Sequence, residues 1–345
     1  MKRLLVAASL VALTAAPAFA ARDQIRIVGS STVYPFTTAV AEQFGKSSGM
    51  KTPVVESTGT GGGMKLFCAG VGVDHPDFTN ASRAIKKGEF EDCVKNGVTE
   101  IVEIKIGFDG LALADSVKGA DMPLTKKQIF MALAKQVPDK DGKLIPNPYT
   151  MWNEIDPSFP AQKIEVYGPP PTSGTRDSFM ELVMEKGAEG FDSLKDLKKA
   201  DAKAYEAVWK SMREDGPFVE AGENDNLIVQ KLIGNPNALG IFGFANVAEN
   251  SDIHALAIDG VVPTIDTIAS GEYKVSRPLF VYAKKQHVGV IPGMAEFVAE
   301  YTSEKAIGED GYLTDKGLIA LPGEEGAKIR AAANAMTVLT ADQVK

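Results

Sequence analysis

Residues 99–114, TEIVEIKIGFDGLALA, form an apolar, β-rich run that is too long for one ordinary strand, because strands in globular proteins usually have about five or six residues. A second such run, YKVSRPLFVYAKK, occupies residues 273–285. If each run crosses from one lobe to another, the chain passes between two lobes twice, and the crossings form a hinge beside a cleft. We therefore predict lobe I over residues 22–107 and 277–345, and lobe II over residues 108–276.

Around these two runs, short apolar stretches alternate with helical patterns. Strands that alternate with helices indicate parallel sheets and the α/β class. Residues 193–213 are predicted to form one polar helix on the surface. The strands expected to precede helices are QIRIVG (24–29), TPVVEST (52–58), DFTNAS (77–82) and KIEVYG (163–168).

The first twenty residues have the pattern of a secretory signal peptide. Lys2 and Arg3 precede an apolar run, and the triplet AFA that ends at Ala20 provides a cleavage site. We therefore expect the mature chain to begin at Ala21 and to be free in the periplasm. No later stretch approaches the ~20 apolar residues that a membrane-spanning helix needs.

Length and charge narrow the class of protein further. The chain has 345 residues, enough for about two domains. Its formal net charge is −8, and loss of Lys2 and Arg3 makes the mature chain about −10. This acidity argues against a nucleic-acid partner, since domains that bind nucleic acid usually have a basic surface.

Two cysteines are present, Cys68 and Cys93. In a secreted protein two cysteines predict one disulfide, and two buried free thiols are the alternative. A bridge closing a loop of this size would stabilise the fold by about 3 kcal/mol. The spacing is not C-x-x-C, so we expect no redox catalysis.

Hydrogen-bond donors gather where the predicted strands end. In α/β proteins these ends face the ligand, and helix starts there carry free N–H groups and a partial positive charge. Hydroxyls, N–H groups and guanidinium groups together suit a tetrahedral oxyanion held without a metal. Taken singly, each segment could instead be a helix cap, a flexible turn or a surface arginine. The segments are Gly29–Thr32, Thr58–Gly63, Ser82-Arg83 and Ser173–Arg176, where Thr172 or Ser173 can cap a helix.

Other kinds of site fit the sequence poorly. The glycine-rich stretch departs from a nucleotide-binding loop, since Met64 precedes Lys65 and Leu66 follows it. A hydrolase of phosphate esters is the less favoured alternative, because no G-x-S-x-G elbow and no metal-ligand cluster is present. The three histidines lie outside the donor segments, and we expect each on the surface; they are His75, His254 and His287. We predict no catalytic residue, no metal and no cofactor.

Five segments occur in an order that resembles a known family. They are GSSTVYPF (29–36), STGTGGGMKLFCAG (57–70), DFTNASRAI (77–85), PTSGTRDSF (171–179) and NDNLIVQKLIGNPNALGIFGFAN (224–246). This pattern resembles the phosphate-binding protein of bacterial high-affinity phosphate ABC transporters. The resemblance implies a type II periplasmic binding protein, in which two α/β lobes close on one inorganic phosphate and deliver it to a membrane permease. We expect a monomer.

The resemblance also implies particular contacts to phosphate. They fall on Ser31, Thr32, Val33, Thr60, Gly61, Ser173, Gly174 and Thr175, to which the donor pattern adds Arg83 and Arg176. Some family members have an Asp where Arg83 stands, and that Asp accepts the proton of phosphate; they have an Arg where Pro169 stands. Arg176 could restore the positive charge. The proton acceptor stays open among Asp77, Asp109 and Asp177, and with it sulfate, molybdate or another tetrahedral oxyanion as the ligand.

Overall fold

The computed structural model describes residues 22–171, 173–222, 225–248 and 250–344. The predicted signal peptide with its cleavage site, and Thr172, lie outside the described residues. Across the described ranges, no helix is long and apolar enough to cross a membrane.

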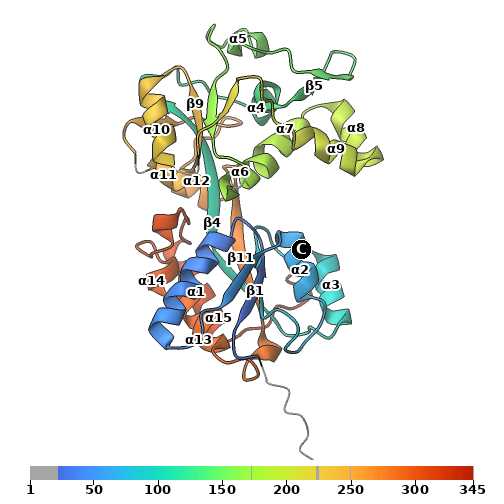
Figure 1. Cartoon of the computed structure of the whole chain (residues 1–345), viewed down its shortest axis with the longest axis vertical. Coiled ribbons are helices and arrows are strands. Elements are labelled where there is room, and N and C mark those ends of the chain that lie inside the picture. The colour runs from blue at the N-terminus through green and yellow to red at the C-terminus, as the bar shows by residue number, and fades with distance from the viewer. Residues whose placement is uncertain (1–21, 172, 223–224, 249, 345) are drawn as a thin grey trace, which may run out of the picture.

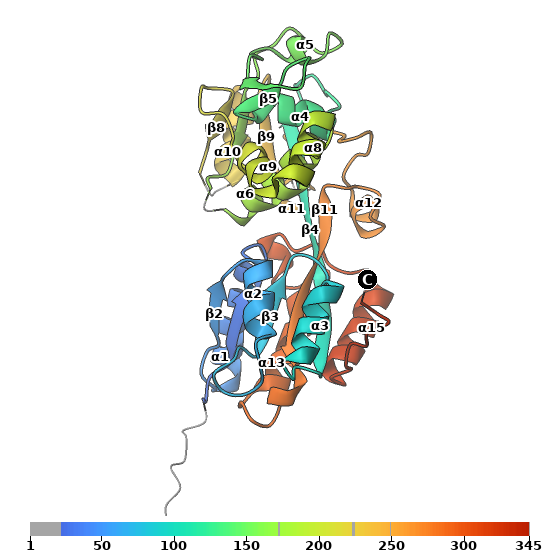
Figure 2. The same ribbon diagram turned by 90° about the vertical axis from the view of Figure 1, so that its right-hand side faces the viewer.

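Two bodies are stacked along the long axis of the molecule and joined by two strands (Figures 1 and 2). The joining strands are β4 (Ile101–Ser116) and β11 (Ser276–Lys284), which pair antiparallel. β4 pairs with β11 over most of its length and with β9 (Leu239–Gly243) toward its end. The long runs predicted from the sequence therefore form strands, and β4 takes part in the sheets of both bodies.

The lower body in Figure 1 contains a parallel sheet that β11 extends. β1 pairs parallel with β2 on one side and with β3 on the other, and β11 pairs antiparallel with β3. β1 and β3 bury their apolar side chains, as short apolar runs in parallel sheets do. The strands are β1 (Arg26–Gly29), β2 (Val54–Ser57) and β3 (Phe78–Ala81), and the helices are α1 (Tyr34–Ser48), α2 (Thr60–Phe67), α3 (Lys87–Lys95), α13 (Met294–Tyr301), α14 (Glu304–Ile307) and α15 (Gly323–Asn334).

The upper body repeats this design around β7. β7 pairs parallel with β8 and β9, and β4 pairs antiparallel with β9 and β10. Its further strands are β5 (Gln136–Pro138), β6 (Leu144–Pro146), β7 (Val166–Gly168), β8 (Phe218–Glu220) and β10 (Ile253–Ala255). Its helices are α4 (Lys126–Leu133), α5 (Trp152–Ile155), α6 (Gly174–Phe179), α7 (Glu185–Ala188), α8 (Asp192–Ala200), α9 (Ala202–Trp209), α10 (Asp225–Gly234), α11 (Phe244–Ala248) and α12 (Ile265–Ala269).

Along β4, the buried side chains pass from the hydrophobic core of the lower body to that of the upper body at a glycine. Ile106 packs in the core of the lower body and Phe108 in that of the upper body. Between them Gly107 has φ +154°, and a β-carbon there would lie 2.6 Å from the carbonyl oxygen of Ile319. The pairing with β11 is irregular just after Leu279. Glycine therefore permits a bulge where the chain passes from one body to the other.

The single helix predicted over residues 193–213 is wrong, because two helices occupy this stretch. α8 ends at Ala200, and the side chain of Asp201 accepts hydrogen bonds from the N–H groups of Lys203 and Ala204. An aspartate that caps the next helix satisfies orphan N–H groups of that helix and sets its start. The chain therefore turns at Asp201.

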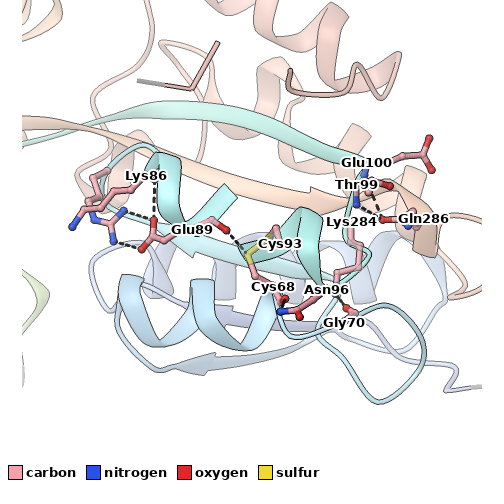
Figure 3. The surroundings of a disulfide bond; sticks show 11 residues. Cys68, Gly70, Lys86, Glu89, Cys93, Asn96, Thr99, Glu100, Lys284 and Gln286 are labelled. Carbon is pink, nitrogen blue, oxygen red and sulfur yellow. Dashed lines mark hydrogen bonds and ion pairs between the residues drawn. A yellow bond between two sulfur atoms is a disulfide. The ribbon is translucent and has the colours of Figure 1, made fainter. Parts of the chain in front are cut away.

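The predicted disulfide is confirmed. Cys68 directly follows α2, Cys93 lies in α3, and the two sulfurs are bonded (Figure 3). The side-chain amide of Asn96 donates to the carbonyl of Cys68 at 2.9 Å, which ties the same two helices together. The bridge therefore fixes α3 against the helix that starts at the glycine-rich loop.

The prediction that all three histidines lie on the surface is wrong for His287. Its ring is buried, its Nε2 accepts the N–H of Gly72 at 2.9 Å, and its Nδ1 therefore donates to the carboxylate of Asp77 at 2.6 Å. Arg22 adds two further bonds to that carboxylate. Asp77 precedes β3, at the opposite end of the strand from the donor segments, so its candidacy as the phosphate proton acceptor is wrong.

Candidate functional site

A cavity of about 600 Å³ lies between the two bodies where the parallel strands end. Ser31 and Gly59 line it from the lower body, while Pro171, Arg176 and Asp177 line it from the upper body. These residues follow β1, β2 and β7. The carboxyl ends of the parallel strands in both bodies therefore face one cleft, which is where α/β proteins bind ligands.

The loop after β1 reaches across the cleft. The hydroxyl of Ser31 donates to Oδ2 of Asp177 at 2.8 Å, and Oγ1 of Thr32 accepts from Nη2 of Arg277 at 2.8 Å. Val33 occupies the cap position of α1 without a side-chain cap from the described residues, although its N–H lies 3.4 Å from Oγ of Ser30. Two hydroxyls of this loop therefore do more than cap α1: that of Ser31 binds Asp177 of the upper body, and that of Thr32 binds Arg277 of a joining strand.

The glycine-rich loop sets the start of α2 against the end of β1. A β-carbon on Gly63 would lie 2.4 Å from Cα of Gly29, so only glycine allows this approach. The hydroxyl of Thr60 accepts the N–H of Ser82 at 3.1 Å. Gly61 is exposed in the first turn of α2, where N–H groups have no partner within the helix. The second and third donor segments are thus brought together.

The S-G-T segment starts α6 beside the first loop. Oγ of Ser173 accepts the N–H of Thr175 at 3.2 Å, so this cap is formed as predicted. A β-carbon on Gly174 would lie only 3.5 Å from Cα of Thr32. Backbone groups from both bodies therefore meet at this point.

Arg176 is a buried cation without a carboxylate partner among the described residues. Its guanidinium lies 4.5 Å from the ring centre of Phe218, and Nη1 donates to the carbonyl of Pro169 at 3.1 Å. Burial lowers the pKa of Arg176, against the effect of Glu220 and Asp177, yet arginine stays charged in proteins. Burying a charge is costly unless it is paired, so this side chain favours an anion in the cleft.

Arg83 has its own partner in the lower body. Its two terminal nitrogens donate to the carboxylate of Glu89 at 2.8 and 2.7 Å. The hydrogen bonds to Glu89 raise the pKa of Arg83. The positive charge of Arg83 is therefore largely satisfied inside the fold, unlike that of Arg176.

Arg277 lies within the β-rich run 273–285 that we predicted to form part of the hinge, and its role beside the site was not predicted. Nη2 of Arg277 donates to Ser178 at 2.6 Å as well as to Thr32, and Nε lies 3.4 Å from Oδ2 of Asp109. The hydroxyl of Ser178 in turn donates to Asp109 at 2.7 Å. An arginine within the β-rich run 273–285 was the available signal, since a buried charge needs partners.

Two of the three candidate proton acceptors remain near the cleft. Asp177 is exposed and lines the cavity. Asp109 is engaged by Ser178 and Arg277 and does not line it. Within the described part of the chain, no group of three or more His, Cys, Asp or Glu residues is placed to hold a metal ion.

Comparisons with known proteins show the family and the fold of the chain. A model of the PBP superfamily domain matches residues 14–305. Protein SphX of Synechocystis sp. is 32% identical over 88% of this chain and 80% of its own length, and the phosphate-binding protein PstS of Staphylococcus saprophyticus is 29% identical over 86% and 80%. The crystal structure of a possible phosphate-binding protein from Planctomyces limnophilus is 30% identical, with a TM-score of 0.71 over 91% of this chain and 98% of that chain.

Proposed function

Because the chain belongs to the PBP superfamily, we propose that it is a substrate-binding protein that captures one inorganic phosphate in the cleft between its bodies. Membership confirms the two-lobed α/β class and the expectation of a binding protein rather than an enzyme. One relative is named as a phosphate-binding protein, and a similar solved structure is described as that of a possible phosphate-binding protein.

The observation that carries the proposal is the unpaired guanidinium of Arg176. It lies at the start of a helix that Ser173 caps, in a cavity that Ser31 lines from the other body. A dianion placed there would receive charge-assisted hydrogen bonds from the guanidinium and further bonds from helix N–H groups. Phosphate satisfies these donors without a metal.

The proposed contacts come from both bodies. Ser31, Thr60 and Gly61 serve from the lower body, and the segment Ser173–Arg176 serves from the upper body. Thr32 accepts from Arg277 and keeps its own O–H to donate to the anion, whereas the N–H of Val33 already donates to Ser30. Arg83 contributes a distant positive charge, since Glu89 takes its donors.

We assign the phosphate proton to Asp177. Its carboxylate borders the cavity beside Arg176 and already accepts from Ser31. Near neutral pH phosphate keeps a proton that sulfate lacks, so an acceptor in the site favours phosphate and repels sulfate. Asp177→Asn should therefore weaken phosphate binding and narrow its preference over sulfate. An unchanged preference would remove Asp177 from this role.

We further propose that the bodies are lobes I and II as predicted, that binding closes them about β4 and β11, and that the closed form is recognised by an ABC permease. Ligand contacts made in the closed form alone supply the differential affinity that shifts the population. We propose that the mature chain acts as a monomer in the periplasm, outside the membrane that holds the permease; the signal-peptide pattern of residues 1–20 supports its export.

Calorimetry on the purified mature protein tests this function. Phosphate and arsenate should bind with one site per chain, and sulfate and molybdate should bind far more weakly. Tight sulfate binding without phosphate binding would reassign the ligand to another tetrahedral oxyanion. No binding of any of the four anions would refute an oxyanion-binding function.

A further inference from the structure

A carboxylate stands at the cleft beside the buried Arg277. Glu181 lies in a π-helical turn, Met180–Met184, that continues α6, and it lines the cavity with about half of its side chain exposed. Its Oε2 is 2.5 Å from Nη1 of Arg277. Such single π-helical turns within α-helices are rare and are frequently found at functional sites.

Among the side chains that contact Arg277, Glu181 is the one that a ligand can replace. Thr32 and Ser178 contribute buried hydroxyls, and Asp109 is held by Ser178 at 2.7 Å. Glu181 alone among these partners borders the cavity. Glu181 also contributes, after Glu89 and Tyr282, to the raised pKa of Arg83. Its carboxylate therefore stands in the field of both Arg277 and Arg83.

We propose that Glu181 is an internal competitor of the bound anion. Its carboxylate neutralises Arg277 while the cleft is empty, and it swings toward solvent when the anion takes over that guanidinium. This inference rests on the proposed phosphate binding. Glu181 thereby lowers the affinity of the cleft for the anion and assists its release, because the carboxylate returns to Arg277 as the anion leaves.

The charges give the direction and size of the effect. A carboxylate and a dianion repel each other, and a half-exposed side chain can move at little cost. Replacing Glu181 by the neutral, equally sized Gln removes both the repulsion and the competition for Arg277. Repulsion of the dianion by a nearby carboxylate, together with competition for the Arg277 guanidinium, should change affinity by about tenfold.

The test compares phosphate dissociation constants of the parent, Glu181→Gln and a control, Glu214→Gln, by calorimetry at pH 8 and constant ionic strength. Glu214 is exposed and lines the same cavity, and no ion pair joins it to a described cation. We expect about tenfold tighter binding for Glu181→Gln and a change below about threefold for Glu214→Gln. Thermal midpoints without phosphate check that each variant is folded.

Each other outcome overturns the inference. Equal tightening in both variants would mean general charge repulsion rather than competition for Arg277. An unchanged constant for Glu181→Gln would exclude competition. Weaker binding would instead make Glu181 an acceptor for the phosphate proton. If the parent protein does not bind phosphate, both the proposed function and this inference are wrong. If the parent binds phosphate and Glu181→Gln has the same dissociation constant, only this inference is wrong.

Discussion

Replacing Arg176 by alanine separates a binding arginine from a structural one. In the ligand-free protein the guanidinium stacks on Phe218 and donates to Pro169. Losing these contacts costs about 1–2 kcal/mol. Removing a buried charge that lacks a carboxylate partner gives back part of this energy. The free energy of unfolding without ligand should therefore change by about 1 kcal/mol or less.

Binding should respond much more strongly. A charge-assisted contact to a desolvated dianion is worth about 2–5 kcal/mol, which corresponds to an increase in the phosphate dissociation constant of about thirtyfold or more. Arg176→Lys should recover only part of the affinity, since an ammonium lacks the planar fork. Calorimetry gives the dissociation constants, and thermal unfolding without phosphate gives the stability of each variant.

Arg83→Ala is the matched control, because it removes an arginine whose donors Glu89 occupies. We expect its phosphate dissociation constant to rise by less than tenfold. If Arg176→Ala bound phosphate like the parent while Arg83→Ala did not, the S-G-T-R segment would be only a helix cap, and the site would have to be rebuilt around Arg83.

Three further predictions concern stability and motion. Removing the disulfide by Cys68→Ala with Cys93→Ala should lower the free energy of unfolding by about 3 kcal/mol in denaturant titrations; an equally stable double variant would show that the bridge is dispensable. Burial lowers the pKa of Lys284 from 10.5 to about 8, so the unfolded chain binds more protons between these pH values and stability should rise with pH there, by up to about 3 kcal/mol relative to Lys284→Met. A parallel pH profile in that variant would contradict this. Small-angle scattering should show a smaller radius of gyration with phosphate, and an identical profile at saturation would argue against lobe closure.

Much of the fold could be predicted from local patterns in the sequence. The two long β-rich runs exceed the length of ordinary strands, and β4 and β11 do join the two bodies. Cys68 and Cys93 are the only cysteines in the sequence, so export to an oxidising compartment was enough to predict a disulfide between them. The break at Asp201 was also visible in principle, because Asp is a preferred helix cap, but the surrounding helical composition concealed it.

Partners across the cleft could not be predicted in the same way. Whether Ser31 caps α1 or binds Asp177 depends on how the two bodies meet, which no local pattern contains. Arg83 and Arg176 looked equivalent in sequence, and only the tertiary contact with Glu89 separates them. The burial of His287 depends on Asp77, which is 210 residues away along the chain.

Crystals of the mature protein grown with arsenate would test phosphate capture most directly, because arsenic can be located by its anomalous scattering and arsenate has the charge and shape of phosphate. We predict one arsenic peak per chain, in the cleft, with arsenate oxygens within hydrogen-bond distance of the Arg176 guanidinium, the Ser31 hydroxyl and the N–H groups that follow Ser173. A single peak outside the cleft, or a cleft peak that Arg176 does not contact, would contradict the proposed site.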